Sequence, residues 1–326
     1  MGAVSRACIA IELAWIALAA PAVADVNIPV PAEVLERQLA TEPFRIASAE
    51  ISRPKAKGDI TLKADLSFTG QPPYRVKLRR AEPGAEDFNN RPRYDLAAYE
   101  LQKLFLDPDE YVVPPTALRM MPLGELRPNA AQAEPTFRGS DEVLVVLQYW
   151  LQEVKVVADV YDPVRFAADP GYARHVGQLN VLTWLIEHGD ANVGNFLLSR
   201  AERSPRVFSV DNGVSFAYNE SDRSDAWKEL RVERLPADTV ERLRRIDRDE
   251  LHRRLGVLAQ WRLEQGRWLA MPPGENLAPH GGVRQQDGVI QLGLRKQEIE
   301  RVARRLKQLL ELVDDGRVGI LEKEQP

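Results

Sequence analysis

The sequence predicts an α+β fold of two lobes, with a small β-rich N-terminal lobe followed by a larger, mainly helical lobe. Apolar and polar residues alternate over residues 60–68, which is the pattern of a half-buried strand. Beyond Trp150 the apolar residues recur mainly at helical spacing. The length of 326 residues agrees with two lobes, because one domain averages roughly 150 residues.

The composition is that of a globular protein. Hydrophobic residues make up 44% of the chain and charged residues 28%, which excludes a disordered, collagen-like or coiled-coil chain. The 44 Lys and Arg residues against 48 Asp and Glu give a net charge of −4. A nucleic-acid-binding domain usually carries a basic excess, so we expect no nucleic-acid partner. The single cysteine, Cys8, allows neither an intramolecular disulfide nor a zinc site of thiolates.

Residues 1–24 have the pattern of a signal peptide. An apolar stretch over residues 13–20 is followed by a small-residue cleavage pattern that ends at Ala24. Cleavage there would make Asp25 the mature N-terminus of an exported protein, in a periplasm, a secretory lumen or the medium. The alternative is a short membrane anchor, but Glu12 interrupts the apolar run, which is shorter than the ~20 residues a bilayer requires. No other window resembles a transmembrane span.

The rest of the chain divides into three segments. Residues 25–50 form a lead-in with a helical pattern at 32–39, residues 51–150 form the N-terminal lobe, and residues 151–326 form the helical lobe. In the first lobe, the spacing predicts strands over 60–68 and 74–78, a helix over 94–105 and a buried strand over 143–147. In the second lobe, it predicts a buried helix over 179–186, a helix opened by a capping box at Asp238, a loop over 272–287 and an amphipathic helix over 299–313.

The residues that carry chemistry lie in two short segments of the second lobe. Asp190 and Asn195 follow the predicted buried helix, and Asp211 and Gly213 follow an apolar strand. Phosphoryl transfer needs a carboxylate such as Asp190 to orient or deprotonate the attacking hydroxyl. It also needs oxygen ligands such as Asn195 and Asp211 for the divalent metal on the nucleotide phosphates. Gly213 would let the chain turn sharply beside the ion. With His188, these residues match the kinase pattern H-x-D-x-x-x-x-N followed by D-x-G.

Other interpretations of these segments fit less well. A stretch rich in Asp, Asn and Gly after a helix is most often a polar turn, which remains the simplest alternative for each segment alone. A calcium loop starting at Asp190 would need Gly at position 195 and Glu at position 201, where the chain has Asn and Ala. A serine-hydrolase elbow is absent, because no G-x-S-x-G occurs. The two segments together, in this order, favour catalysis.

In the N-terminal lobe, Lys77 lies in an apolar strand, where a buried ammonium needs a partner charge or a phosphate. The alternative is an exposed lysine in a basic run with Arg79 and Arg80. If Lys77 is buried, its acidic partner should come from the next helix, where Asp95 and Glu100 compete.

Four motifs resemble those of atypical kinases: the Golgi secretory-pathway (casein-kinase-type) kinases, the phosphoinositide 4-kinase-like family and the HipA toxin kinases. The motifs are D-L-A-A-Y-E-L-Q from Asp95, V-V-P-P-T from Val112, L-N-V-L-T-W-L-I-E-H-G-D-A-N-V-G-N ending at Asn195, and D-N-G-V-S-F from Asp211. The resemblance covers roughly residues 51–313. It implies a two-lobed, protein-kinase-like fold that uses ATP with Mg²⁺ or Mn²⁺.

The resemblance also assigns roles to individual residues. It implies that Lys77 holds the nucleotide phosphates and that Asp95, preferred over Glu100, pairs with Lys77 or helps to bind metal. It makes Asp190 the catalytic carboxylate, with Asn195 and Asp211 as metal ligands.

Several features depart from the family pattern. Asp95 is shorter than the usual Glu, and Ala191-Asn192 stands where the family has Arg-His or Arg-Asn. The phosphate-covering loop is reduced to a weak turn at Lys57-Gly58-Asp59. By position alone, Gln148-Tyr149-Trp150 is the expected adenine-binding hinge.

Two classes of function follow. The first is an ATP- and metal-dependent phosphotransferase that acts on a hydroxyl of a protein, glycan or lipid. The second is a catalytically silent, exported pseudokinase that serves as a binding or interaction module. A variant of the first class would transfer an adenylyl group instead of phosphate.

Overall fold

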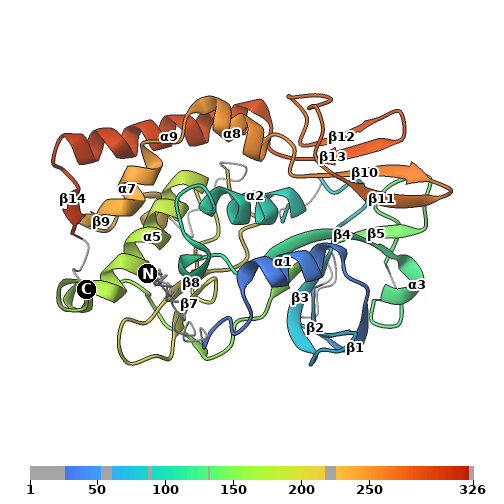
Figure 1. The fold of residues 1–326 in the computed structure, drawn as a ribbon, viewed down its shortest axis with the longest axis horizontal. Coiled ribbons are helices and arrows are strands. Elements are labelled where there is room, and N and C mark those ends of the chain that lie inside the picture. Colours follow the sequence, from blue (N-terminus) through green and yellow to red (C-terminus); the bar gives the residue numbers. More distant parts are fainter. Residues whose placement is uncertain (1–25, 53–60, 87–89, 131–132, 217–224, 323–326) are drawn as a thin grey trace, which may run out of the picture.

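The structure is a computed structural model that describes residues 26–52, 61–86, 90–130, 133–216 and 225–322. The predicted leader and the turn at Lys57-Gly58-Asp59 lie outside these residues. No helix in the described part of the chain is long and apolar enough to cross a membrane. The described chain forms two lobes, one with a five-stranded sheet and one with most of the helices (Figure 1).

The N-terminal lobe is an antiparallel sheet of five strands in the order β1-β2-β3-β5-β4. The strands are β1 (Phe44–Ile51), β2 (Thr61–Phe68), β3 (Tyr74–Arg80), β4 (Thr116–Pro122) and β5 (Glu142–Tyr149). The predicted strands at 74–78 and 143–147 are confirmed, and the one at 60–68 is confirmed over residues 61–68; residue 60 lies outside the described residues. Because side chains alternate along a strand, Val76 and Leu78 of β3 lie in the core on one face. Lys77 and Arg79 therefore lie on the opposite face.

Helices cover both faces of this sheet. Helix α1 (Ala32–Thr41) packs on the apolar face through Leu39, next to the short helix α3 (Leu123–Leu126). Helix α2 (Pro92–Gln102) packs against β4 and β5 on the other face, where Val146 belongs to its core cluster. Strand β1 and α1 thus belong to the sheet lobe, although their residues fall in the segment that the sequence separates as a lead-in. Strand β1 pairs with β2 from Phe44 to Ile51, with a register shift between Ile46 and Ser48.

The C-terminal lobe is built around α5 (Pro170–Ile186), which is buried almost throughout its second half, as its apolar sequence predicts. The other helices are α4 (Pro163–Ala168), α6 (Asp225–Lys228), α7 (Ala237–Leu243), α8 (Arg248–Leu255) and α9 (Lys296–Asp314), and a 3-10 turn spans Pro108–Glu110. Two small sheets lie among them: β6 (Val154–Val156), β7 (Phe196–Ser199) and β8 (Val207–Ser209) form one, and β9 (Arg234–Pro236) pairs with β14 (Gly319–Leu321).

A further antiparallel sheet, here called the accessory sheet, lies between α8 and α9 in the chain (Figure 1). Its strands are β10 (Ala259–Glu264), β11 (Arg267–Met271), β12 (Val283–Gln286) and β13 (Val289–Leu292). It reaches the N-terminal lobe, where the buried carboxylate of Glu142 accepts a hydrogen bond of 2.5 Å from the Trp268 backbone N–H. The expectation of a loop over 272–287 is therefore wrong at its C-terminal end, because β12 pairs there with β13.

The predicted capping box at Asp238 is also wrong. Helix α7 begins at Ala237, and Pro236 occupies the N-cap. The Asp238 carboxylate instead accepts two hydrogen bonds from the guanidinium of Arg174, at 2.8 and 2.7 Å. The same carboxylate accepts a hydrogen bond of 2.8 Å from the Thr239 N–H, so Asp238 lies within the first turn of α7 and not at its N-cap.

Candidate active site

Asp211 stands at the centre of the candidate site. It follows β8 with a left-handed backbone conformation (φ 63°), and its Oδ1 accepts a hydrogen bond from the Lys77 ammonium of β3. Burial alone would raise the pKa of Asp211, but the charges of Lys77 and Arg79 outweigh it and lower the pKa to about 2. Asp211 is therefore ionised at neutral pH, and an ion pair between the lobes joins β3 to the end of β8.

The acid of α2 has a different partner from the one expected. Asp95 is buried and accepts a hydrogen bond from the Arg79 guanidinium. Glu100 accepts one from Lys103, at 2.6 Å. Neither acid is hydrogen-bonded to Lys77, whose ammonium donates to Asp211. Burial raises the pKa of Asp95, while the charges of Arg79 and Lys77 oppose that change.

The loop after α5 is organised by hydrogen bonds around Asp190. Its carboxylate accepts hydrogen bonds from the side-chain amides of Asn192 (2.6 Å) and Asn195 (3.2 Å). The Asn195 amide also donates to the backbone carbonyl of Asp190, at 2.6 Å. The Asp190 carboxylate is thus held in one orientation by two neutral donors.

Asn192 is a site residue that the sequence did not identify. It stands in the Ala191-Asn192 departure from the family pattern, yet it makes the shorter of the two side-chain hydrogen bonds to Asp190. A polar side chain two residues after a candidate acid could have indicated this, since Asn readily bonds to nearby groups in a turn.

His188 supports the same loop from inside the lobe. It is fully buried, and its Nδ1 lies 3.3 Å from the backbone N–H of Asp190, from which it accepts a hydrogen bond. Burial lowers the pKa of His188 to about 4. The imidazole is therefore neutral at pH 7, which the acceptor role at Nδ1 requires.

The two site segments lie side by side because their backbones are hydrogen-bonded. Strand β7 pairs with β8, and the Val210 N–H continues the ladder with a bond of 2.8 Å to the Asn195 carbonyl. The Gly189 N–H donates to the Val214 carbonyl, also at 2.8 Å. The loop that carries Asp190 is thus joined on both sides to the segment that carries Asp211.

The chain turns at Asn212-Gly213, as expected, but the turn does not require a left-handed glycine. The residues of this segment with positive φ are Asp211 and Phe216, and Gly213 is not among the glycines with positive φ. A Cβ on Gly213 would lie 2.9 Å from Nη1 of Arg79 and 3.1 Å from Oδ2 of Asp95. The glycine is needed because the chain passes directly against the buried Arg79–Asp95 pair.

The oxygen atoms of Asp211 and Asn195 suit a hard divalent cation such as Mg²⁺ or Mn²⁺. Since the Asn195 amide nitrogen donates to Asp190, its Oδ1 is the atom that can face an ion. Mg²⁺ is usually held by one or two carboxylates together with substrate phosphates and water. Among the described residues, no group of three or more His, Cys, Asp and Glu side chains could hold a metal.

The segment expected as a hinge lies at the end of β5. The Gln148 side chain is buried and donates to Thr116 Oγ1 at 3.0 Å, and Tyr149 packs against Tyr74 with ring centroids 5.8 Å apart. The Trp150 backbone N–H donates to the Arg75 carbonyl, at 3.0 Å. The Lys63 ammonium lies 5.6 Å from the partly exposed Trp150 ring.

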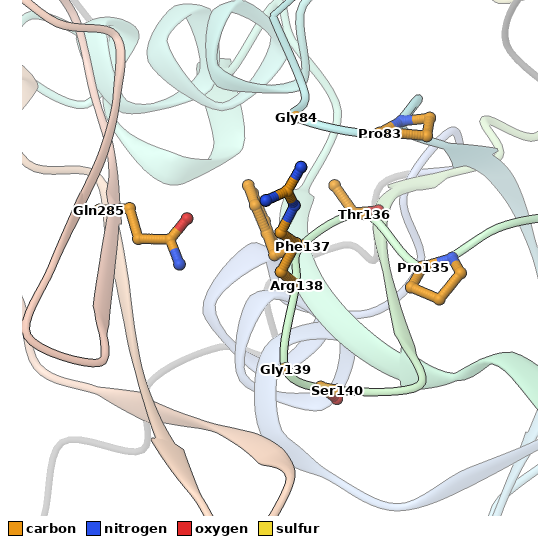
Figure 2. A pocket seen from close by; sticks show the side chains of 9 residues that line it. All are labelled: Pro83, Gly84, Pro135, Thr136, Phe137, Arg138, Gly139, Ser140 and Gln285. Carbon is orange, nitrogen blue, oxygen red and sulfur yellow. The ribbon is translucent and has the colours of Figure 1, made fainter.

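A cleft of about 510 Å³ lies elsewhere, where the N-terminal lobe meets the accessory sheet (Figure 2). The loop after β3 contributes Gly84, the segment before β5 contributes Phe137 and Arg138, and Gln285 comes from β12. None of the candidate site residues lines this cleft.

The comparisons with known proteins bear on the fold. No protein-family model matches the sequence. The search of curated proteins finds no match. A solved structure described as the crystal structure of the Golgi casein kinase is similar, with a TM-score of 0.51, 12% sequence identity, and coverage of 87% of this chain and 74% of that chain. At this identity the likeness is one of fold, and the chain has a two-lobed, kinase-like fold.

Proposed function

We propose that the protein is an atypical kinase that uses ATP with Mg²⁺ or Mn²⁺ to phosphorylate a hydroxyl group. The observation that carries the proposal is the position of Asp211. It is a carboxylate ionised at neutral pH that lies between the N-lobe lysine Lys77 and the loop of Asp190 and Asn195. The kinase-like fold supports it by analogy, because the similar solved structure is that of a kinase.

Each residue has a role that its contacts support. Asp190, held by Asn192 and Asn195, would accept the proton of the attacking hydroxyl. Asn195 Oδ1 and the Asp211 carboxylate would hold the metal, which neutralises the charge that develops on the phosphates. Lys77 would leave Asp211 and bind the phosphates, for which a compact ammonium suffices. The acceptor would be a hydroxyl group of an unidentified protein, glycan or lipid.

The proposed function is tested with purified protein, labelled ATP and Mn²⁺, in wild type, Asp190→Asn and Asp211→Asn. The wild type should transfer label to itself or to a supplied hydroxyl substrate. Asp190→Asn should lower the rate by roughly 10²- to 10⁴-fold while it keeps metal–nucleotide binding. Asp211→Asn should lose binding as well, because it removes a metal ligand. Label transfer that is equal in all three proteins would refute the assignment. Intact mass of the product separates phosphate transfer from adenylyl transfer.

A silent pseudokinase is the second candidate, and one observation favours it. Lys77 is bonded to Oδ1 of Asp211, so the cation already neutralises the proposed metal ligand. A protein that keeps this ion pair would not melt at a higher temperature with Mn²⁺ and ATP. A binding site occupied at 100 times its dissociation constant should add about 2.7 kcal/mol of stability. The thermal shift therefore distinguishes the two candidates before any substrate is known.

A further inference from the structure

Arg79 occupies a position that neither the motifs nor the comparisons assign. It lies two residues after Lys77 on β3 and therefore on the same face of the sheet. Its side chain is only 2% exposed. One end of the guanidinium, Nη2, bonds to Asp95 of α2, and the other end, Nη1, lies 3.7 Å from Oδ1 of Asp211. The guanidinium of Arg79 thus lies next to two carboxylates, that of Asp95 on α2 and that of Asp211 after β8.

The surroundings fix this guanidinium in place. The backbone of Gly213 passes so close that a Cβ there would lie 2.9 Å from Nη1. The Gly213 carbonyl accepts a hydrogen bond of 2.9 Å from the Arg91 N–H, which joins the segment to the start of α2. Across the sheet, Arg79 stands opposite the apolar Val146. Arg79 is therefore held between β5, α2 and the segment after β8.

The two cations of β3 differ in what they can do. A guanidinium is always charged and binds through a rigid, planar set of donors, whereas an ammonium on a flexible stem changes partners readily. Lys77 is more exposed, at 18%, and its partner Asp211 is 36% exposed. Arg79 and Asp95 are exposed by only 2% and 4%. The buried Arg79–Asp95 ion pair is therefore fixed, whereas the more exposed Lys77–Asp211 ion pair can exchange partners.

We propose that Arg79 is a positioning residue, which holds the Asp211 carboxylate and helix α2 in place while Lys77 alone moves from Asp211 to the nucleotide phosphates. This inference rests on the proposed function, because it concerns the same nucleotide site. Arg79 takes the position next to the α2 acid, so Lys77 needs no partner from that helix. The shorter Asp95 fits this arrangement, because the long Arg79 side chain reaches it.

The competing explanation is that Arg79 and Asp95 form a purely structural ion pair. Replacing a buried ion pair with apolar residues of similar size is often neutral or stabilising, whereas removing one partner is strongly destabilising. The double variant Arg79→Met/Asp95→Leu therefore restores the folding stability that Arg79→Met loses, under either explanation. It leaves Asp211 without its fixed cation but also removes Asp95, an acid that could itself bind metal. The single variants Arg79→Met and Arg79→Lys keep Asp95, so a loss of metal binding that they share with the double variant is due to Arg79.

The experiment measures the melting temperature and the affinity for Mn²⁺ with a non-hydrolysable ATP analogue in wild type, Arg79→Met, Arg79→Lys and the double variant. Arg174→Met serves as the control, since it breaks an ion pair with Asp238 in the other lobe. The double variant should melt above Arg79→Met and yet bind the metal–nucleotide roughly 10- to 100-fold more weakly than wild type, the usual effect of removing a partner of a metal ligand. Arg174→Met should lose stability without loss of affinity.

Wild-type affinity in the double variant would overturn the positioning role. If the double variant does not fold, Arg79→Lys decides the question: it keeps the charge, should fold and should still lose affinity, and wild-type affinity there would also overturn the proposal. The two proposals fail in different ways. If wild type itself does not bind Mn²⁺ and nucleotide, the proposed function fails, and the role of Arg79 fails with it. If wild type binds and the Arg79 variants bind equally well, only the role of Arg79 fails.

Discussion

Arg93 of α2 and Glu298 of α9 join the two lobes through a buried, two-point ion pair. Nη1 and Nη2 of the guanidinium donate to the two carboxylate oxygens at 2.6 and 3.0 Å, across 205 residues of sequence. Burial alone would raise the pKa of Glu298, but the bonds from Arg93 and from the Tyr94 hydroxyl lower it. Helix α2, which carries Asp95, is thus attached to the first turn of α9.

We predict that Arg93→Met destabilises the protein by about 3–5 kcal/mol, because it leaves a buried carboxylate without its cation. Urea denaturation measures this change. The double variant Arg93→Met/Glu298→Leu should recover most of the loss. The control is Arg248→Met, which removes a partly exposed partner of Glu300 and should cost at most about 1 kcal/mol. An Arg93→Met variant as stable as this control would contradict the prediction.

His188 should make stability depend on pH in the mildly acidic range. Its folded pKa of about 4 lies below the ordinary value of 6.5, so the unfolded chain takes up a proton first. The stability that neutral His188 contributes is therefore complete above about pH 6.5 and is lost as the pH falls through 4. Over this range the loss should be on the order of 3 kcal/mol.

His188→Asn keeps an acceptor near the Asp190 N–H and cannot be protonated. We expect its curve of unfolding free energy against pH to be flatter than that of wild type between pH 6.5 and 4. Denaturant titrations at a series of pH values test this. Parallel curves for the two proteins would show that His188 does not control the acid sensitivity.

Asn192 should affect the chemical step more than nucleotide binding. Its side-chain amide donates to Asp190 Oδ1 at 2.6 Å, which links it to the proposed base and not to the lysine or the metal ligand. If the proposed function is correct, Asn192→Ala should lower kcat roughly 10- to 150-fold, since a hydrogen bond to a charged group contributes ~1.5–3 kcal/mol. The KM for ATP should stay unchanged. A change in KM with constant kcat would indicate that Asn192 contacts the nucleotide instead.

Gly213→Ala should disturb the site although the change is small. The added Cβ would meet Nη1 of Arg79 at 2.9 Å and Oδ2 of Asp95 at 3.1 Å, so the ion pair must shift. We expect a loss of roughly 1–3 kcal/mol in stability and weaker Mn²⁺–nucleotide binding. Gly124→Ala is the matched control, because no atom lies within 4 Å of its Cβ position. Equal melting temperatures for the two variants would exclude the close approach as the reason for this glycine.

The elements that the sequence predicts well have regular patterns of their own. The alternation in β2 and the apolar stripe of α9 reflect local periodicity, and the structure places both as expected. The accessory sheet has no such signal, because strands such as β12, Val-Arg-Gln-Gln, are short and polar. Strand β1 is mostly exposed. Its buried and exposed residues do not alternate regularly, so the sequence has no clear strand pattern there.

The candidate site, too, could be predicted from the sequence only where its residues lie in a local motif. Asp190, Asn195 and Asp211 could be identified because each lies in a compact motif. The partner of Lys77 could not, because Asp211 is 134 residues away and only the tertiary fold brings it near. Arg79 looked like part of an exposed basic run, yet it is 2% exposed. The clue in the sequence was its spacing of two residues from Lys77, which places both on one face of the strand.

The accessory sheet gives the N-terminal lobe a second attachment to the C-terminal half of the chain. Strand β5 meets the C-terminal half of the chain at both of its ends: Trp150 continues into the second lobe, and Glu142 is bonded to Trp268. Over the eight residues of β5 these two attachments lie roughly 25 Å apart, at ~3.3 Å per residue. A rotation of the sheet lobe about a single hinge at Trp150 would therefore have to break the hydrogen bond between Glu142 and Trp268.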